Sequence, residues 1–338
     1  MQVSIVIVNY KQPNLTIQCV NSIIKHTLNI KYEIIVVDNC SKDDSKQIIS
    51  NKFHTIKYIQ LDENIGYSRA NNIGINISTG KYILVLNNDT IFIENILFKL
   101  CQLLDEKQNI SAACVQLYYE DMTKQLSGSN FVFLGLNVLL TFPYISNILK
   151  YIVKKLKVKK PHPSKSTGKE KVDWISGAFM FVRRKDLINI GAFDEDFFLF
   201  SEEAEWCYRL NQVGYVVIFP ELSLIHLGGK TMSSTITDES ENYYPYWDKK
   251  GLQLMVSNLL RIRKQYGVVL TFIHLMLYFF ASLIDVSCTT ILYMFTKLFV
   301  TKNKYSIEKS ISFMKNSFVL LRYFPSILIK RKKLYKVI

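Results

Sequence analysis

The stretch YILVLNNDT, residues 82–90, joins five apolar residues to two amides and a carboxylate. An apolar run of this length predicts a buried strand. Asn and Asp are common in the turns after strands because their side chains bond to the local backbone. An ordinary turn would therefore explain residues 87–89. The alternative interpretation is that this strand end presents a ligand site.

Short apolar runs alternate with helical patterns through the first half of the chain. The expected strands are residues 3–8, 33–37, 56–61, 82–86 and 112–117, and helical spacing occurs over 15–24, with Asn14 as N-cap, and over 94–104. This alternation predicts an α/β fold with a mostly parallel sheet flanked by helices. Ligands of such sheets bind beyond the carboxyl ends of the strands, where Asp38 and Asp89 occur.

The formal charge of +14 is concentrated in two segments of the 338-residue chain. Residues 150–171 carry a net +8 and residues 302–336 a net +9, so the remainder carries −3. Two basic segments on a nearly neutral body favour contact with an anionic surface, and solvated lysine faces are the alternative. The lysine segments contain few aromatic residues and match no nucleic-acid-binding module, which argues against a nucleic-acid partner.

The composition also suggests two regions and a cellular compartment. We expect a catalytic domain over residues 1–240, with a basic insertion or linker at 146–171, and a helical, apolar and basic region over 241–338. The six cysteines are scattered, and the chain begins without a basic start or cleavage site, so we expect a cytoplasmic location.

Residues 267–296 contain a single charged side chain, Asp285. A membrane-spanning helix needs about 20 apolar residues, and a mid-bilayer aspartate is costly. We therefore expect two shorter helices, 267–283 and 286–300, that form a hairpin on or partly in the cytoplasmic leaflet. A helical interface of a homodimer is the alternative.

Two common phosphate-binding motifs are missing from the sequence. The first apolar run continues into NYKQPN, residues 9–14, which has no glycine, so the G-x-G-x-x-G turn of dinucleotide-binding proteins is excluded. The glycine–lysine loop of nucleoside triphosphatases is also missing. A divalent metal held by carboxylate is the usual alternative for binding phosphate.

Seven motifs occur in the order known from family 2 glycosyltransferases. They are VSIVIVNYKQ, EIIVVDNCSKDDS, NIGYSRANNIGI, YILVLNNDT, WISGAFMFVRR, GAFDEDFFLFSEEAEWCYRL and IHLGGKTM. Over residues 3–232 the chain thus resembles this family, and especially its rhamnosyltransferase-like branch, which builds bacterial surface polysaccharides. The resemblance implies a nucleotide-diphospho-sugar transferase fold of the GT-A type and an inverting, single-displacement transfer.

The resemblance also implies a metal site at the end of the quoted stretch. Asn87, Asn88 and Asp89 occupy the place of the family's D-x-D motif, so Asp89 supplies its carboxylate alone. His226 matches a family histidine near the diphosphate and would be a second ligand, although a lone histidine can also be structural. Mg²⁺ or Mn²⁺ at this site would stabilise the charge of the departing nucleoside diphosphate.

Further residues are assigned by the same resemblance. Asp38 would contact the base or ribose, and Arg69 would offset diphosphate charge. The nucleotide-sugar site would also include Asn39, Asn64, Gly66, Asn71, Asn72 and Asn88. The acceptor side would include Trp174, Ser176, Gly177, Ala178 and Glu202, although Trp174 could equally belong to the core.

The catalytic base is expected in SEEAE, residues 201–205. As a structural alternative, Ser201 would be the N-cap of a helix whose first turn is acidic. Helical spacing pairs Glu205 with Arg209 and puts Glu203 on an inward face, where lower solvation would raise its pKa. Glu203 also matches the second acid of the family's Glu-Asp motif, so we expect Glu203 to be the base.

The sequence therefore predicts a metal-dependent transferase of rhamnose or a hexose at the cytoplasmic face of the cell membrane. The donor would be dTDP- or UDP-linked and the acceptor a lipid-linked or oligosaccharide molecule. A basic nucleic-acid-binding protein and a catalytically inactive scaffold are the alternatives. Asp38, Asp89, Glu203 and His226 are all present, which argues against the scaffold.

Overall fold

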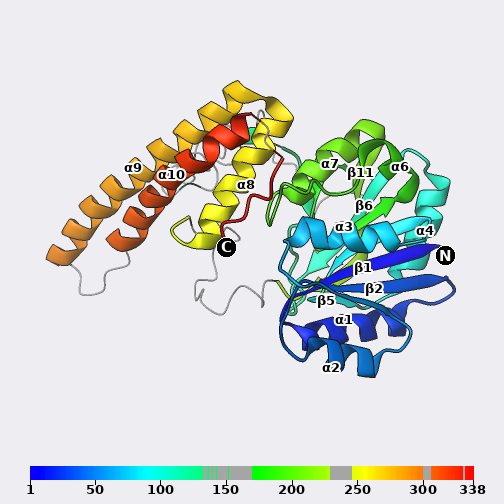
Figure 1. Cartoon of the computed structure of the whole chain (residues 1–338). Coiled ribbons are helices and arrows are strands. Elements are labelled where there is room, and N and C mark those ends of the chain that lie inside the picture. The colour runs from blue at the N-terminus through cyan, green and yellow to red at the C-terminus, as the bar shows by residue number, and fades with distance from the viewer. Residues whose placement is uncertain are drawn as a thin grey trace. The chain divides into compact units, whose positions relative to one another are not determined.

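The computed structural model describes residues 1–131, 135–136, 139, 142, 151, 170–228, 246–299, 306–329 and 332–338. The chain forms two compact units (Figure 1). The first comprises Met1–Asn130, Pro161–Phe198 and Glu202–Thr237, and the second comprises Phe131–Lys160, Leu199–Ser201 and Asp238–Ile338. The predicted basic insertion lies outside the described residues apart from Tyr151, Glu170 and Lys171.

A large sheet forms the centre of the first unit. Its described strands are β1 Val3–Asn9, β2 Tyr32–Asp38, β3 Lys57–Gln60, β4 Tyr82–Asn87, β5 Thr90–Phe92, β6 Ile110–Tyr118, β8 Glu170–Lys171, β10 Phe179–Arg183 and β11 Tyr215–His226. The order is β3-β2-β1-β4-β10-β6-β11-β5, and β8 pairs with β11. Strand β10 is antiparallel to both β4 and β6, so β1, β2, β3, β4, β6 and β11 all run in one direction. The mostly parallel sheet is thus confirmed.

Helices cover the sheet on both faces. The described helices of this unit are α1 Pro13–His26, α2 Ser45–Lys52, α3 Tyr67–Ile77, α4 Ile96–Glu106, α6 Arg184–Ile190 and α7 Glu202–Val213. Helices α3, α6 and α7 lie on one side and α1 and α2 on the other (Figure 1). The prediction of Asn14 as N-cap is wrong, because α1 already begins at Pro13. Proline suits the first helical position because it has no N–H to leave unsatisfied.

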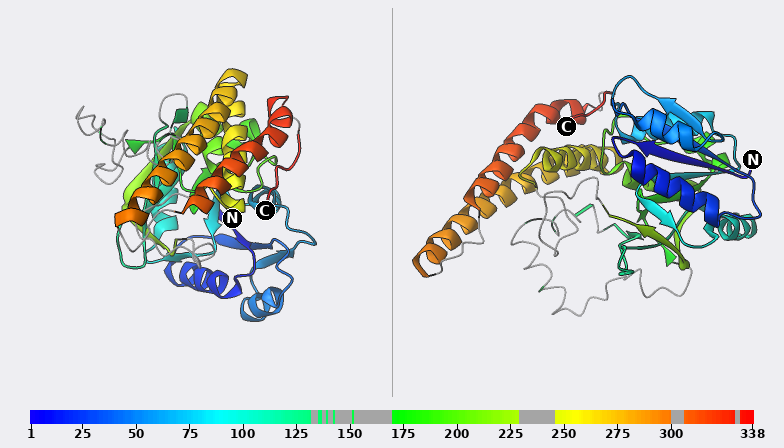
Figure 2. Two further views of the ribbon diagram at one scale, coloured as in Figure 1. Left: turned by 90° about the vertical axis from the view of Figure 1, so that its left-hand side faces the viewer. Right: turned by 90° about the horizontal axis from the view of Figure 1, so that it is seen from below.

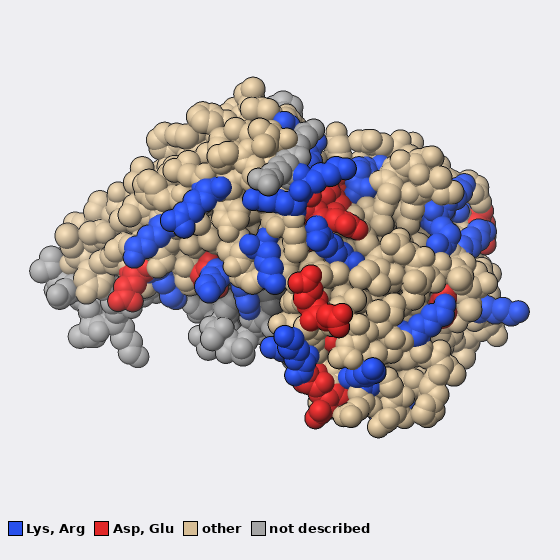
Figure 3. Space-filling model, in the orientation of Figure 1, with Lys and Arg blue, Asp and Glu red and all other residues tan. Residues whose placement is uncertain are grey.

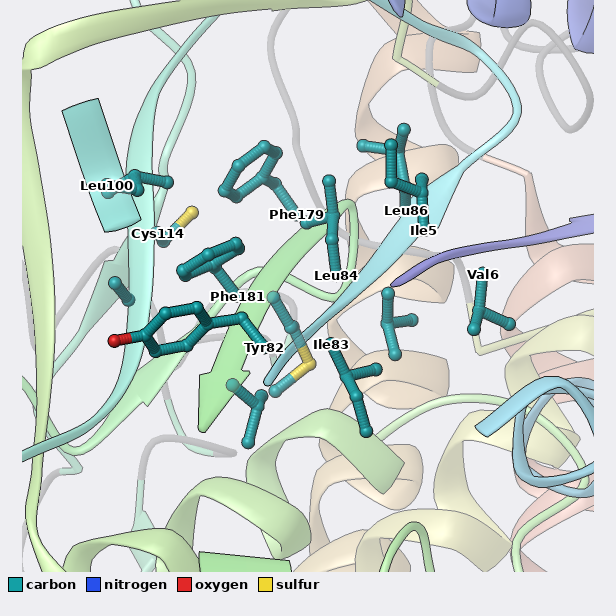
Figure 4. Packing of buried hydrophobic residues seen from close by; sticks show 14 of the residues in the cluster. Ile5, Val6, Tyr82, Ile83, Leu84, Leu86, Leu100, Cys114, Phe179 and Phe181 are labelled. Carbon is teal, nitrogen blue, oxygen red and sulfur yellow. The ribbon is translucent and has the colours of Figure 1, made fainter. Parts of the chain in front are cut away.

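Strand β4 shows why the quoted stretch changes character at Asn87. Residues 82–86 have no solvent-exposed surface, because β1 and β10 flank the strand and helices cover its faces. The ring of Tyr82 stacks on Phe181 with centroids 5.0 Å apart, in the same buried cluster as Leu100 and Phe179 (Figure 4). Each buried apolar side chain contributes roughly 1.5–3 kcal/mol. This burial holds the strand in place and puts residues 87–89 at the carboxyl edge of the sheet.

The second unit is helical in its described part. It contains α8 Lys249–Tyr266, α9 Val268–Phe299 and α10 Ile307–Leu328, and α9 and α10 run side by side (Figures 1 and 2). The Asp248 carboxylate caps α8 by accepting from the Gly251 N–H at 2.6 Å. Ser306 caps α10 in the same way by accepting from the Lys309 N–H.

The predicted pair of helices over 267–300 is wrong, because α9 is one continuous helix of 32 residues. Asp285 does not interrupt it, since its side chain is buried near Ser310 of α10. Within α9, Val268–Phe295 has a mean hydropathy of 2.0 and is long and apolar enough to cross a membrane. No other helix in the described ranges meets both conditions.

Candidate active site

The candidate site lies where β2, β4 and β11 end. These strands run in the same direction, so their last residues, Asp38, Asn87 and His226, all lie at the carboxyl edge of the sheet. Ligands of open α/β sheets bind at this edge. The topology therefore brings the polar end of the quoted stretch together with a histidine far along the chain.

Asp89 and His226 are direct neighbours. The Oδ1 atom of Asp89 lies 3.3 Å from Nε2 of His226, and the carboxylate residue is only 4% exposed. Pairing of β5 with β11 sets His226 opposite Thr90, the residue after Asp89. Nδ1 of His226 lies 2.8 Å from Oε1 of Gln125, which also donates from Nε2 to the His226 carbonyl. Gln125 thus holds the imidazole ring with Nε2 directed at Asp89.

The Asp89–His226 pair fits two adjacent ligands of a divalent cation. Ligand atoms about 2.1 Å from an octahedral metal are separated by about 3.0 Å when adjacent, close to the observed spacing. An amide oxygen on Nδ1 is a typical outer partner of a metal-binding histidine, because it leaves Nε2 free to bind. In the described part of the chain, no three His, Cys, Asp or Glu side chains are placed to hold a metal ion together. Water and diphosphate oxygens would have to complete such a site.

Tyr67 lies at the centre of the site, although the sequence analysis did not single it out. Its hydroxyl donates to Oδ1 of Asn87 at 2.9 Å and lies 3.1 Å from the Gly177 carbonyl oxygen. Burial, and then the charges of Glu202, Glu203 and Asp89, raise the pKa of Tyr67 far above its usual range. Tyr67 therefore stays a hydrogen-bond donor. From sequence alone, an aromatic residue at a helix start indicates core packing.

Two loops of the predicted nucleotide site are joined by hydrogen bonds. The Asn39 amide donates to Oδ1 of Asn64 at 2.9 Å, and the Gly66 N–H donates to the same atom at 3.0 Å. Gly66 has a φ of +87°, and an added Cβ would lie 2.6 Å from the Phe198 carbonyl oxygen. Only glycine fits there without moving backbone. The structure therefore brings Asn39, Asn64 and Gly66 together, and their nucleotide-binding role stays a prediction.

The Asp38 carboxylate is fully buried and is already bonded by the protein. It accepts from the Asn9 amide at 2.6 Å and from the N–H and hydroxyl of Ser41 at 2.8 and 2.6 Å. These bonds fix the turn that follows β2. Contact of Asp38 with the base or ribose stays a prediction.

The remaining predicted nucleotide residues make contacts within the first unit. Arg69 donates to the Glu195 carbonyl at 3.0 Å, the Asn71 amide to the Tyr67 carbonyl, and the Asn88 amide to Oγ1 of Thr16 at 3.2 Å. Asn72 links α3 to residue 193 by accepting from the Phe193 N–H and donating to its carbonyl. Ligand roles for these residues stay predictions.

Glu202 is more buried than Glu203, whereas the sequence predicted the opposite. Glu202 is 5% exposed and its Oε2 has no hydrogen-bond partner in the described ranges, whereas Glu203 is half-buried. Burial, and then the charge of Glu203, raise the pKa of Glu202 well above its ordinary value. The expectation that Glu203 occupies the less solvated position is therefore wrong. The predicted ion pair of Glu205 and Arg209 is confirmed, with 2.7 Å between Oε2 and Nη2.

The backbone immediately before Glu202 is unusual. Phe200 and Ser201 have φ angles of +72° and +63°, which turn the chain sharply into the helix. Ser201 lacks the extended backbone typical of an N-cap, and its hydroxyl donates to Oδ1 of Asn258 at 2.7 Å within the second unit. Left-handed backbone at two successive non-glycine residues is uncommon and is found most often near functional sites.

Among the predicted acceptor-side residues, Gly177 lies next to Glu203. An added Cβ at Gly177 would lie 3.6 Å from Cβ of Glu203, so this glycine borders the half-buried glutamate. Trp174 is half-buried against the sheet core and pairs through its backbone with Ser129, where β9 Trp174–Ile175 meets β7 Gly128–Ser129. The acceptor roles of these residues stay predictions.

A mostly parallel sheet flanked by helices, with its polar constellation at the carboxyl edge, has the GT-A architecture of nucleotide-diphospho-sugar transferases. Among solved structures, residues 1–349 of Staphylococcus aureus TarS superpose with a TM-score of 0.52 at 13% identity, covering 98% of this chain and 88% of that one. Mannosyltransferase PcManGT from Pyrobaculum calidifontis, in complex with GDP-Man and Mn²⁺, superposes with a TM-score of 0.50 at 13% identity and the same coverage. At this identity the likeness shows the fold alone.

The model of glycosyl transferase family 2 matches residues 4–191, more than half of the chain, and the protein belongs to this family. Rhamnosyltransferase WbbL of Escherichia coli K12 is 28% identical over 216 residues, which span 60% of this chain and 76% of that protein. Several other curated glycosyltransferases match over 91–123 residues, and there the chain spans less than half of their length. The match to WbbL agrees with the rhamnosyltransferase-like resemblance of the motifs.

Proposed function

We propose that this protein is an inverting glycosyltransferase that moves rhamnose or a hexose from a nucleoside diphosphate to a lipid-linked or glycan acceptor in surface polysaccharide synthesis. The observation that carries the proposal is the Asp89–His226 pair at the carboxyl edge of the sheet, close to two glutamates. Family membership supports sugar transfer in general. TarS in complex with UDP-GlcNAc and PcManGT in complex with GDP-Man support a nucleotide-sugar donor.

On the donor side, Asn39, Asn64 and Gly66 form the loops that receive the nucleotide, and Asp38 fixes the turn beside them. Asp89 and His226 would hold Mg²⁺ or Mn²⁺. Gln125 orients the imidazole ring of His226. The bound cation supplies charge stabilisation for the departing nucleoside diphosphate. Arg69 and Asn88 complete the surroundings of the diphosphate.

On the acceptor side, Glu203 is the general base. Two neighbouring carboxyl groups whose pKa values are pushed apart divide into one that keeps its proton and one that is ionised. Burial favours the protonated form of Glu202, and this leaves its half-buried neighbour Glu203 as the candidate base. It takes the proton of the acceptor hydroxyl as that oxygen attacks the anomeric carbon opposite the leaving group. Gly177, which has no Cβ, leaves space beside Glu203 for the acceptor, and the ring of Trp174 would line the same side.

We place the enzyme at the cytoplasmic face of the cell membrane. The six cysteines are unpaired, and five of them are buried, which supports a reducing compartment. A lipid-linked acceptor would be reached from this face.

The test is thermal stabilisation by a panel of sugar nucleotides, including dTDP-rhamnose, UDP-hexoses and GDP-mannose, with Mg²⁺, Mn²⁺ or EDTA. Wild type should be stabilised by one donor in the presence of metal, by about 2.7 kcal/mol at 100 times its Kd. Asp89→Ala should lose this metal-dependent stabilisation. Glu106→Ala, which removes an exposed carboxylate of α4, should keep it. Equal stabilisation of Asp89→Ala and wild type would contradict the metal assignment.

A further inference from the structure

The exposed face of α9 is apolar, whereas its buried face combines polar residues with the apolar Leu275, Tyr278 and Ala281. Its buried positions include Thr271, His274, Ser282, Asp285 and Thr289, each at most 8% exposed. Its exposed face is apolar, with side chains 40–72% exposed at Val268, Val269, Phe272, Ile273, Phe280, Leu283, Ile284, Ile291, Met294 and Phe295. A soluble amphipathic helix turns its apolar stripe inward and its polar residues toward water. We call this exposed face the α9 apolar stripe.

The buried polar residues of α9 are bonded inside the second unit. Nε2 of His274 lies 3.2 Å from the Gly135 carbonyl oxygen, and the Ser310 hydroxyl of α10 donates to Oγ1 of Thr289 at 3.0 Å. These inward polar groups therefore have partners, and the described part of the unit leaves the apolar stripe exposed. The stripe extends over 28 residues, about 40 Å at 1.5 Å per residue. A continuous exposed apolar surface of this size marks an interaction site.

The neighbouring face of α10 identifies the partner. Exposed Lys315, Phe318 and Arg322 follow one another at helical spacing. The Phe318 ring packs edge-on against Phe279 of α9 with centroids 5.2 Å apart, so the basic residues flank the stripe. Figure 3 shows a row of Lys and Arg over α10 beside the largely uncharged surface over α9. Basic residues interleaved with aromatic ones beside an apolar face are typical of helices that lie in a membrane interface.

We propose that the α9 apolar stripe lies in the plane of an anionic lipid bilayer, at the boundary of headgroups and acyl chains, and does not cross it. A crossing α9 would carry α10 with it, because the two helices pack along their length. Lys315 and Arg322 would then enter the hydrocarbon, where charged side chains are costly. In the in-plane arrangement the same two residues meet anionic headgroups.

The biological role of membrane docking rests on the proposed function, whereas the experiment that tests docking does not depend on it. Through the covalent chain, the docked helix holds the catalytic unit at the membrane that contains a lipid-linked acceptor. Vesicle binding itself requires no sugar nucleotide. A failure of docking and a failure of donor binding are therefore separate results.

The first experiment is flotation of the full-length protein with vesicles of phosphatidylcholine alone or with 30% phosphatidylglycerol. Wild type should float with the anionic vesicles, and Phe280→Glu combined with Ile284→Glu should reduce binding at least tenfold. The control is Ile188→Glu, which places the same charge at an apolar residue of α6 that is 84% exposed. It should bind as wild type does. All variants should keep metal-dependent stabilisation by the donor.

Two outcomes would overturn the docking proposal. One is equal vesicle binding by the stripe variant and wild type. The other is recovery of wild type as a detergent-free soluble dimer without vesicle affinity, which would make the stripe an interface between copies of the chain.

The second experiment measures depth. Phe272, Phe280 and Phe295 are replaced one at a time by Trp, and quenching of the added fluorescence is measured with lipids brominated at shallow or deep acyl positions. An in-plane helix predicts that shallow bromines quench all three equally. Deep quenching confined to Phe280→Trp would show a crossing helix and overturn the in-plane arrangement.

Discussion

Glu202 and Glu203 are adjacent in the sequence but have different surroundings. Glu202 is buried, and its Oε2 has no hydrogen-bond partner among the described residues, whereas Glu203 is half-buried beside Gly177. A buried carboxyl group favours its protonated form because the charged form is poorly solvated there. The more exposed neighbour can ionise and reach a substrate. This difference supports the proposal that the base is Glu203, the less buried of the two residues.

Replacing the base should affect the chemical step alone. Glu203→Gln should lower kcat by about 10²–10⁴-fold, the usual contribution of general base catalysis, while the donor Kd changes little. Glu202→Gln is the matched control, because a neutral amide replaces a neutral carboxyl group, and it should lose less than tenfold. Transfer kinetics and donor binding are measured on both variants. The opposite ranking would assign the base to Glu202.

The raised pKa of Glu202 should also appear in the pH dependence of stability. Between its unfolded pKa, near 4.5, and its higher folded pKa, the folded state binds more protons than the unfolded state. Stability from this group is therefore present at low pH and is lost as the pH rises through that window. The Glu202→Gln variant cannot ionise at this position. The difference between its melting temperature and that of wild type should therefore shift in favour of the variant as the pH rises above 4.5. A difference independent of pH would contradict the raised pKa.

At the scale of single elements, apolar periodicity was sufficient for β1, β2, β3, β4, β6, α1 and α4. It did not indicate β5, which is short, or the reversed direction of β10, because strand direction depends on tertiary pairing. The same applies to α9: a local pattern cannot tell whether Asp285 interrupts a helix or turns into a bundle. Ser310 of α10, which lies beside it, is far away in the sequence.

In the site, too, residues within local sequence motifs could be predicted, whereas roles that depend on tertiary contacts could not. Asp89 and His226 could be predicted because motifs carry them, and the structure brings them together. Tyr67 and Gln125 could not, because their roles depend on which strands end beside them. The relative burial of Glu202 and Glu203 depends on tertiary packing, and the two residues follow left-handed backbone at Phe200 and Ser201. Non-glycine residues give no clear signal of such backbone in a single sequence.

At the scale of the whole molecule, two features act together on the same partner. The chain carries a formal net charge of +14, and its second unit exposes the α9 apolar stripe. Long-range attraction to anionic lipid is screened by salt, with a Debye length of about 10 Å at 0.1 M and about 3 Å at 1 M. Burial of apolar surface is not screened. Salt therefore separates the two contributions.

The contribution of Lys315 and Arg322 to membrane binding should depend on salt. Lys315→Gln combined with Arg322→Gln should weaken binding to anionic vesicles by about 2 kcal/mol at low salt, roughly 30-fold, because each basic residue near the surface contributes about 1 kcal/mol. At 1 M salt the same variant should bind as wild type does, since only the stripe still contributes. Lys25→Gln combined with Lys52→Gln removes equal charge from exposed positions of α1 and α2 and should have little effect. Equal weakening by both pairs would mean that net charge, and not the α10 face, attracts the membrane.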